Sequence, residues 1–191
     1  MSKQRRLDGL VSEIESDSAF DELRESATQI VRGAGSLSSN VMFVGEAPGR
    51  QEDEGGRPFM GASGRILDHV LQELGVSRDS VYVTNIVKYR PPGNRDPLSQ
   101  EKTDFLLYLS REIEIIKPKV IAPLGRHSLS VLLPEVKIGD GHGREYECVM
   151  GGESYVIIPM YHPAATIYNR KLRSDFQADI ARLIKALKLI N

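Results

Sequence analysis

The residues of this sequence that are best suited to chemistry lie in three polar stretches, each directly after an apolar run. The first stretch runs from Gly45 to Phe59, the second begins at Asn85, and the third contains His162. Short apolar runs bounded by turn residues predict buried strands. Side chains at the carboxyl ends of parallel strands meet at one edge of a sheet, which is where ligands bind in open α/β folds. The spacing therefore predicts that the three stretches share one site.

The first stretch combines a tight glycine turn with a carboxylate and an aromatic ring. Gly45 and Gly49 bracket a turn that brings backbone N–H groups close to a bound group, and Glu46 lies where a strand-end side chain points into the cleft. The stretch is not a phosphate-binding loop, because the Lys-Ser/Thr pair is missing. Phe59 lies in a hydrophilic segment without apolar periodicity, so it either fills the core or offers a base a flat stacking surface.

Asn85 and His162 are single polar side chains at predicted strand ends. An asparagine in such a place usually caps a turn, but its amide also offers a donor and an acceptor side by side to a nucleobase edge. A lone histidine is more often structural than catalytic. His162, however, is held between a buried strand and Pro163, which suits an oxyanion stabiliser. Among the other histidines, His127 after Gly125 is the second choice.

Basic residues gather in the same loops, although the formal net charge of the chain is only −1. These residues are Arg57, Lys88, Arg90, Arg95, Arg170, Lys171 and Arg173. Taken alone they would be interpreted as solvated charges. Their concentration at the expected ligand edge favours contacts to phosphate groups, whereas the net charge excludes a uniformly basic nucleic-acid coat.

Hydrophobic periodicity predicts helices that alternate with strands. The expected helices span about 4–16, 20–30, 63–74, 97–116, 125–133 and 175–189, and the strands about 41–44, 81–83, 120–123, 146–149 and 155–158. Such alternation predicts a three-layer α/β/α fold with a central, mainly parallel four-stranded sheet. We expect a single domain over 1–191 with the helices of 1–38 packed on it, and we interpret 139–143 as a loop.

Composition places the chain among ordinary globular proteins, with 27% charged and 40% hydrophobic residues in a length of 191. No apolar run approaches bilayer length, and the first residues lack the apolar segment of a signal peptide. We therefore expect a cytoplasmic, intracellular protein without membrane contact. The one cysteine, Cys148, excludes an internal disulfide and a cysteine-only metal site, and we expect no metal.

The ordered set of motifs resembles the uracil-DNA glycosylase superfamily, most closely its fourth, thermostable family. The matching segments are GEAPG followed by ED and GRPFMGASG, then VTNIVKYRPPGNRDP, then PLG and YHPAA, over roughly residues 40–170. The resemblance implies a monofunctional enzyme that flips uracil out of single- or double-stranded DNA and hydrolyses its N-glycosidic bond, which initiates base excision repair. We expect it to act as a monomer.

The resemblance also implies a role for each matching residue. Phe59 would stack on uracil, Asn85 would read the uracil edge and reject cytosine, and His162 would donate to O2 as negative charge develops there. Ala47 stands where the superfamily's best-known branch has an aspartate that helps to activate water, so Glu46 is the carboxylate expected to orient water. Ala47 and Glu52 are expected to form walls of the pocket, with Glu52 placed against the 5-methyl group of thymine. The expected DNA contacts are Arg57, Lys88, Arg90 and Arg95. The wedge that fills the gap left in the duplex is expected to consist of Ile167, Tyr168 and Arg170.

The chain departs from the fourth family at the four cysteines that normally bind a four-iron cluster. The corresponding positions hold Ser18, Asp21, Tyr89 and Phe105. None of these residues supplies the thiolate that holds such clusters. We therefore expect no cluster, with Tyr89 packed against Phe105 in its structural place.

Three alternatives stay open on the sequence alone. One is a glycosylase with a different base preference, such as hypoxanthine or a mismatched base. Another is a non-catalytic binder of damaged DNA that keeps the fold, which the loss of the cluster suggests and the retained Glu46, Phe59, Asn85 and His162 oppose. The third is an enzyme acting on small nucleotides, for which the sequence lacks any dinucleotide or P-loop signature.

Overall fold

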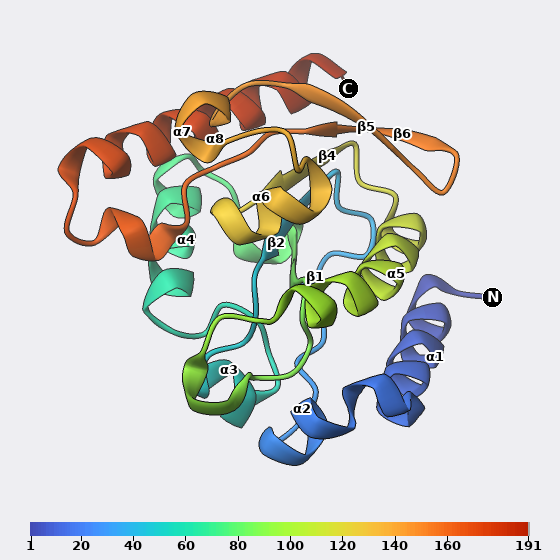
Figure 1. The fold of residues 1–191 in the computed structure, drawn as a ribbon. Coiled ribbons are helices and arrows are strands. Elements are labelled where there is room, and N and C mark those ends of the chain that lie inside the picture. The colour runs from blue at the N-terminus through green and yellow to red at the C-terminus, as the bar shows by residue number, and fades with distance from the viewer. Residues whose placement is uncertain (191) are drawn as a thin grey trace.

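The computed structural model describes residues 1–190, with side chains as far as residue 187. Six strands form one sheet in the order β1-β3-β2-β4-β6-β5 (Figure 1). They are β1 (Ala34–Gly35), β2 (Val41–Gly45), β3 (Tyr82–Asn85), β4 (Val120–Pro123), β5 (Tyr146–Met150) and β6 (Glu153–Ile157). The four central strands are parallel, and β1 and β5 pair antiparallel at the two edges.

The predicted fold class is confirmed, with two more strands in the sheet than expected. The parallel core of β3, β2, β4 and β6 has the expected four members, and all four end at the same edge. The edge strand β5 forms the hairpin with β6 that the two strand-like runs around Gly151 and Gly152 indicated. The other edge strand, β1, has only two residues, so it leaves no hydrophobic pattern to read.

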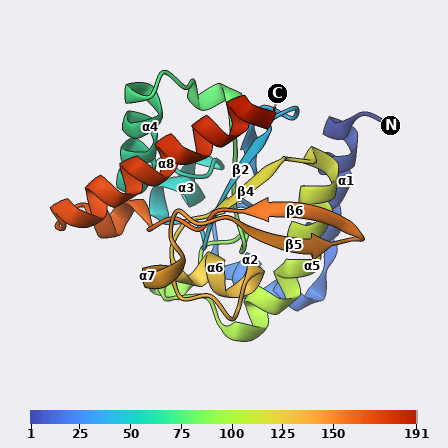
Figure 2. The ribbon, with the colours of Figure 1, turned by 90° about the horizontal axis from the view of Figure 1, so that it is seen from above.

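Helices cover both faces of the sheet. They are α1 (Lys3–Ser16), α2 (Asp21–Ser26), α3 (Arg50–Gly55), α4 (Ala62–Glu73), α5 (Ser99–Ile116), α6 (Arg126–Leu132), α7 (Ile138–Gly141) and α8 (Arg170–Ile190). Figure 2 shows α4 and α8 on one face and α1, α5 and α6 on the other. No helix in the described part of the chain is both long and apolar enough to cross a membrane.

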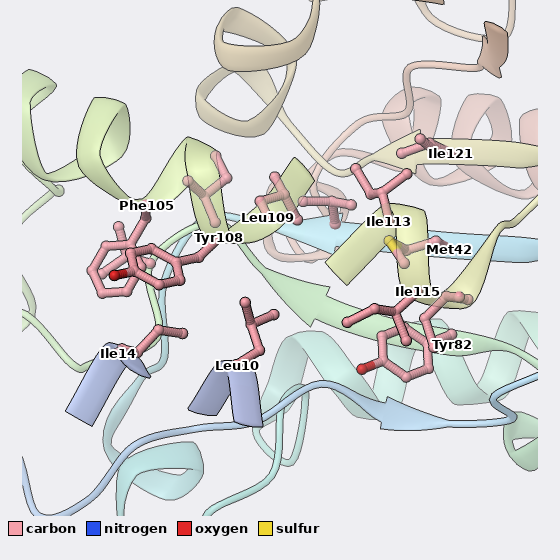
Figure 3. Packing of buried hydrophobic residues seen from close by; sticks show 14 of the residues in the cluster. Leu10, Ile14, Met42, Tyr82, Phe105, Tyr108, Leu109, Ile113, Ile115 and Ile121 are labelled. Atoms are coloured by element: carbon pink, nitrogen blue, oxygen red, sulfur yellow. The ribbon is translucent and has the colours of Figure 1, made fainter. Parts of the chain in front are cut away.

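Apolar stripes on the helices explain this layering. Phe105, Leu109 and Ile113 recur every four residues along α5, so they lie on one face of that helix and pack against the sheet (Figure 3). On the opposite face, Leu67 and Leu71 of α4 are buried with Phe176 and Ile180 of α8, in the pattern of a second amphipathic layer. Burial of each such side chain stabilises the fold by about 1.5–3 kcal/mol.

The N-terminal helix is tied to α5 by polar contacts as well as by packing. Lys3 Nζ donates to the carbonyl of Ile116 at 2.7 Å and to that of Leu37 at 2.9 Å. The hydroxyl of Tyr108 donates to Asp17 Oδ2 at 2.7 Å. These bonds satisfy a helix-end carbonyl and fix α1 beside the outer face of α5.

Four helices differ from the prediction for local reasons. The expected helix over 20–30 is a 3₁₀ turn followed by α2, and it ends at Ser26. Helix α8 begins at Arg170, five residues early, because Asn169 Oδ1 accepts the N–H groups of Lys171 and Leu172 and so caps it. Helix α7 (Ile138–Gly141) overlaps the segment 139–143 that was expected to be a loop. The unpredicted α3 is polar throughout and has no apolar stripe to reveal it.

Candidate active site

The three polar stretches leave the sheet at its carboxyl edge. Gly45 at the end of β2 pairs with Asn85 at the end of β3, so the first and second stretches emerge side by side. On the other side of β2, the N–H of Gly125 donates to the carbonyl of Met160 at 2.8 Å. This bond brings the loop that carries His162 to the same edge, where parallel strands expose a crevice for ligands.

Phe59, Asn85 and His162 line one pocket of about 250 Å³. The ring centroids of Phe59 and His162 lie 6.3 Å apart, with planes tilted by 39°. Ala47 and Glu52 belong to the same wall. The pocket therefore presents an aromatic face, an amide and an imidazole to one guest, from three segments far apart in the sequence.

Close approach of Phe59 to the sheet requires glycine at two positions. A Cβ on Gly45 would lie 2.3 Å from Asn85 Oδ1 and 2.7 Å from the ring of Phe59. A Cβ on Gly64 would lie 1.7 Å from the carbonyl oxygen of Phe59. Phe59 itself has a φ of 58°, a conformation that costs a residue with a side chain about 1–3 kcal/mol. The surroundings thus hold this ring in a strained position at the pocket.

The backbone of Asn85 is fixed from behind by a buried ion pair. Lys88 Nζ donates to the carbonyl of Asn85 at 2.7 Å and to Glu112 Oε2 at 2.6 Å. It also donates to Thr84 Oγ1 at 2.6 Å, and the hydroxyl of Tyr82 donates to Glu112 Oε1 at 2.8 Å. This network lies under the end of β3 and holds the strand that presents Asn85 to the pocket.

This burial corrects the expectation that Lys88 contacts DNA. Only 3% of Lys88 is exposed, and its ammonium group is enclosed by Thr84, Asn85 and Glu112. A buried lysine needs such partners because an isolated ammonium group is costly to remove from water. Lys88 therefore supports the site from inside and does not reach a phosphate group.

His162 is a neutral hydrogen-bond donor at neutral pH. Burial, helped by the charge of His127, lowers the pKa of His162 to about 4. Its Nδ1 accepts the N–H of Ala164 at 3.2 Å, so the proton of the neutral ring is on Nε2. Gly125 allows the ring to sit this close to the sheet, because a Cβ there would lie 2.8 Å from the Cβ of His162.

Glu46 lies on the other side of His162, in a neighbouring hollow of about 340 Å³. Gly125, His127, Tyr161 and His162 line this hollow with it. Burial, and then the negative charge of Asp96, raise the pKa of Glu46 to about 7. A carboxyl group with such a pKa can exchange a proton near neutral pH, as a general base must.

Glu46 lies in a cluster with His127 and Asp96. His127 Nδ1 lies 3.4 Å from Glu46 Oε1, and His127 Nε2 lies 3.4 Å from Asp96 Oδ2. The histidine thus lies between two carboxylates, and the negative charge of Asp96 helps to raise the pKa of Glu46. Asp96 was not singled out in the sequence and His127 only as a second choice, although PLGRH follows a buried strand and so had to reach the same sheet edge.

Glu52 has a second task besides lining the pocket. Its Oε2 accepts the N–H of Gly49 at 3.1 Å and its Oε1 accepts the N–H of Gly61 at 2.7 Å. The carboxylate therefore closes the N-terminus of α3 and ties it to the segment that follows Phe59. A change at Glu52 would alter the shape of the pocket as well as its chemistry.

The basic residues expected at DNA differ in their surroundings. Arg95 makes a bidentate pair with Glu101 at 2.6 and 2.9 Å, and Arg90 Nε donates to Asn94 Oδ1 at 2.7 Å. Arg57 lines a separate hollow together with Arg78 and Asp79. Arg95 and Arg90 are only partly free to meet phosphate groups, because each already has an acceptor in the protein.

The segment after His162 projects a hydrophobic tip. Tyr168 is 97% exposed and Ile167 is 47% exposed, just before the start of α8 at Arg170. These two large side chains are adjacent in the chain, and Ile167 lines a hollow together with Ala62, which also lines the pocket. Their position beside the pocket suits insertion into a base stack.

Comparison with known proteins agrees with this geometry. The family model "Uracil DNA glycosylase superfamily" matches residues 32–188. The chain belongs to this superfamily. A Type-4 uracil-DNA glycosylase from Archaeoglobus fulgidus is 40% identical to it over 182 residues, covering 93% of this chain and 91% of the relative. Type-4 enzymes from Sulfurisphaera tokodaii and Pyrobaculum aerophilum are 43% and 44% identical, covering 82% and 79% of this chain and 74% and 80% of the relatives.

This uracil-DNA glycosylase superfamily member does not provide the ligands of an iron–sulfur cluster. Phe20, which lies between positions 18 and 21, stacks on Phe105 with centroids 3.9 Å apart and planes tilted by 17°. Tyr89 lies 6.4 Å from Phe105, and Tyr108 lies 5.6 Å from Phe20. Buried rings occupy this region, and the one cysteine, Cys148, lies on β5. The residues present therefore do not fit a four-iron cluster.

Proposed function

We propose that this chain hydrolyses the N-glycosidic bond of uracil flipped out of DNA. The observation that carries the proposal is the single pocket lined by Phe59, Asn85 and His162. The superfamily membership and the similarity to Type-4 uracil-DNA glycosylases support it. An enzyme that acts on a base inside a duplex must extrude the base into such a pocket.

Base recognition rests on two side chains in this account. Phe59 offers its face to the flat uracil ring, and base–aromatic stacking contributes about 1–3 kcal/mol. The amide of Asn85 meets the uracil edge, where its donor and acceptor match O4 and N3–H. Cytosine carries an amino donor in place of O4 and an acceptor in place of N3–H, so the same amide, held in the same orientation, would face it with two mismatched pairs. Ala47 and Glu52 complete the wall.

Departure of uracil is assisted by His162. As the C1′–N1 bond breaks, its electron pair moves onto the uracil ring and negative charge develops at O2. The neutral Nε2–H of His162 donates to that oxygen. Removal of one donor of this kind typically costs about 2.7–4 kcal/mol of transition-state stabilisation.

Glu46 is the proposed base for the attacking water. Its carboxylate lies in the hollow next to the base pocket, with His162 as the shared wall. Water attacks C1′ of the cation-like sugar and gives its proton to Glu46. Because the pKa of Glu46 is about 7, the carboxylate is present in useful amounts at neutral pH.

DNA would be bound through the rim of this site. We assign phosphate contacts to Arg57, Arg90, Arg95 and Arg170, and the wedge to Ile167 and Tyr168 with Arg170. Lys88 is left out because it is buried. A few local cations suffice for salt-dependent binding of DNA, so the near-neutral net charge is no obstacle. We further propose that residues 1–191 form one domain that acts as a monomer on single- or double-stranded DNA, since all of these groups lie on one chain.

We also propose that the protein works without an iron–sulfur cluster, with the rings of Phe20, Tyr89, Phe105 and Tyr108 in its structural place. Thiolate ligands are required to hold such a cluster, and the positions concerned offer none. Purified protein should lack the broad visible absorbance of iron–sulfur centres and should contain no stoichiometric iron. Either signal would refute this part of the proposal.

The function is tested with oligonucleotides that carry one defined base. U·G, U·A, T·G, hypoxanthine-containing and single-stranded uracil substrates are compared at equal enzyme concentration, and abasic sites are cleaved with alkali. We expect cleavage of the uracil substrates and none of T·G. Preferred cleavage at hypoxanthine would indicate a shifted base preference. Binding without an abasic product at micromolar enzyme would indicate a non-catalytic binder.

A further inference from the structure

The hollow next to the base pocket holds a histidine between two carboxylates that come from different elements. Glu46 follows β2, Asp96 lies in the loop before α5, and His127 lies in the first turn of α6. Both ring nitrogens of His127 lie 3.4 Å from a carboxylate oxygen, one of Glu46 and one of Asp96. His162 lines the same hollow, so the cluster adjoins the reacting bond in the proposed function.

Arg126 selects the tautomer of His127. Its Nε–H donates to His127 Nε2 at 3.1 Å, so the proton of the neutral ring is on Nδ1. That nitrogen is the one that faces Glu46 Oε1. Glu46 Oε1 is buried and accepts no well-aligned hydrogen bond from the described residues. A small movement of either side chain would let Nδ1–H serve this unsatisfied oxygen.

Resting on the proposed function, we propose that His127 and Asp96 are positioning residues that set the charge and orientation of Glu46 for the attack of water. In this step the water oxygen bonds to C1′, one water proton goes to the Glu46 carboxylate, and the electron pair of the broken C1′–N1 bond stays on uracil. The proton of Glu46 then returns to solvent, and the uracil anion is protonated from solvent.

The charges that face Glu46 act in opposite directions. Burial and Asp96 raise its pKa, whereas Lys102 on α5 and Arg126 on α6 lower it. The pKa of His127 is lowered by burial and by the cations Arg126 and Lys102, and raised by Asp96. The neutral His127 thus faces Glu46 as a donor, which favours the ionised carboxylate. The rate should therefore rise with pH through about 7, as Glu46 loses its proton.

Substitutions of the two positioning residues should move this acidic limb of the pH profile in opposite directions. Asp96→Asn removes the negative charge that raises the pKa of Glu46, so the limb should move to lower pH by about half to one unit. His127→Leu removes the donor to the carboxylate, so the limb should move to higher pH by a similar amount. His127→Asn places an amide N–H near the position of Nδ1 and should restore part of the shift.

The measurement is the single-turnover rate of uracil release from pH 5 to pH 9, with Asp104→Asn as the matched control. Asp104 lies on α5 and accepts from Gln100 at the surface, so this variant should keep the wild-type profile. Unfolding curves of all variants test whether they are folded. If His127→Leu does not fold, the comparison is made with His127→Asn. The inference would be refuted if the acidic limb of the pH profile stayed in place in the Asp96 and His127 variants, or moved in the same direction in both. An inactive wild type would instead refute the proposed function.

Discussion

At the scale of single residues, base choice depends on Asn85. Asn85→Asp replaces the amide donor by a second acceptor, which no longer matches O4 of uracil but matches the amino group of cytosine. One bidentate pair is worth about 1–3 kcal/mol, so uracil excision should fall about 5- to 150-fold while cytosine excision becomes detectable. Excision from matched U·G and C·G duplexes measures this change. Loss of uracil excision with no gain of cytosine excision would contradict a role of Asn85 in base choice.

His162 should affect the rate of chemistry more than binding. His162→Leu removes the donor to O2 and should lower kcat by about 10²- to 10³-fold with little change in KM. His162→Gln keeps an N–H near the position of Nε2 and should lose less. His69→Gln changes an exposed histidine of α4 that pairs with Glu73 and serves as the control. If the leucine and glutamine variants lost the same activity, donation to O2 would not be the role of this ring.

At the scale of elements, the end of β3 depends on the buried pair of Lys88 and Glu112. Lys88→Met leaves the Glu112 carboxylate buried without its cation, which should lower the free energy of unfolding by about 3–5 kcal/mol. The double variant with Glu112→Leu removes both charges and should recover most of this loss. Urea unfolding of the two variants and of the surface control Arg50→Met gives the comparison. A double variant as unstable as the single one would contradict this account.

The elements that sequence predicted best are those with an apolar pattern. The strands β2, β3, β4 and β6 and the long helix α5 have buried runs or stripes, and each was placed within a few residues. The short or polar elements β1, α3 and α7 were missed. Their formation depends on tertiary partners, as when Asp53 of α3 accepts the N–H of Thr28 at 2.8 Å, and such long-range contacts leave no local periodicity.

At the scale of the whole molecule, buried rings link three segments that are distant in sequence. Phe105 of α5 contacts Phe20 before α2 and Tyr89 after β3. Phe105→Ala should lower the free energy of unfolding by about 3–5 kcal/mol, because it opens a cavity where the three segments meet. Leu107→Ala changes a side chain that is 62% exposed on the same helix and should have little effect. Equal effects of the two substitutions in urea unfolding would show that the rings do not hold these segments.

The topology of the sheet also explains which parts of the site could be predicted from the sequence. Phe59, Asn85 and His162 follow strands of one parallel sheet, so topology alone was enough to bring them together. The burial of Lys88 could not be predicted, because its partner Glu112 lies 24 residues away on a helix whose facing depends on the packed core. The same holds for Asp96, which reaches Glu46 only through the position of the loop before α5.

The most direct test of the central claim is a crystal structure of the protein with free uracil, the product of the proposed reaction. The account predicts uracil in the pocket of about 250 Å³, with its ring over Phe59, its N3 and O4 edge at the amide of Asn85, and O2 within hydrogen-bond distance of His162 Nε2. Uracil bound in the hollow beside Glu46 and His127, or anywhere else outside the first pocket at saturating concentration, would contradict it.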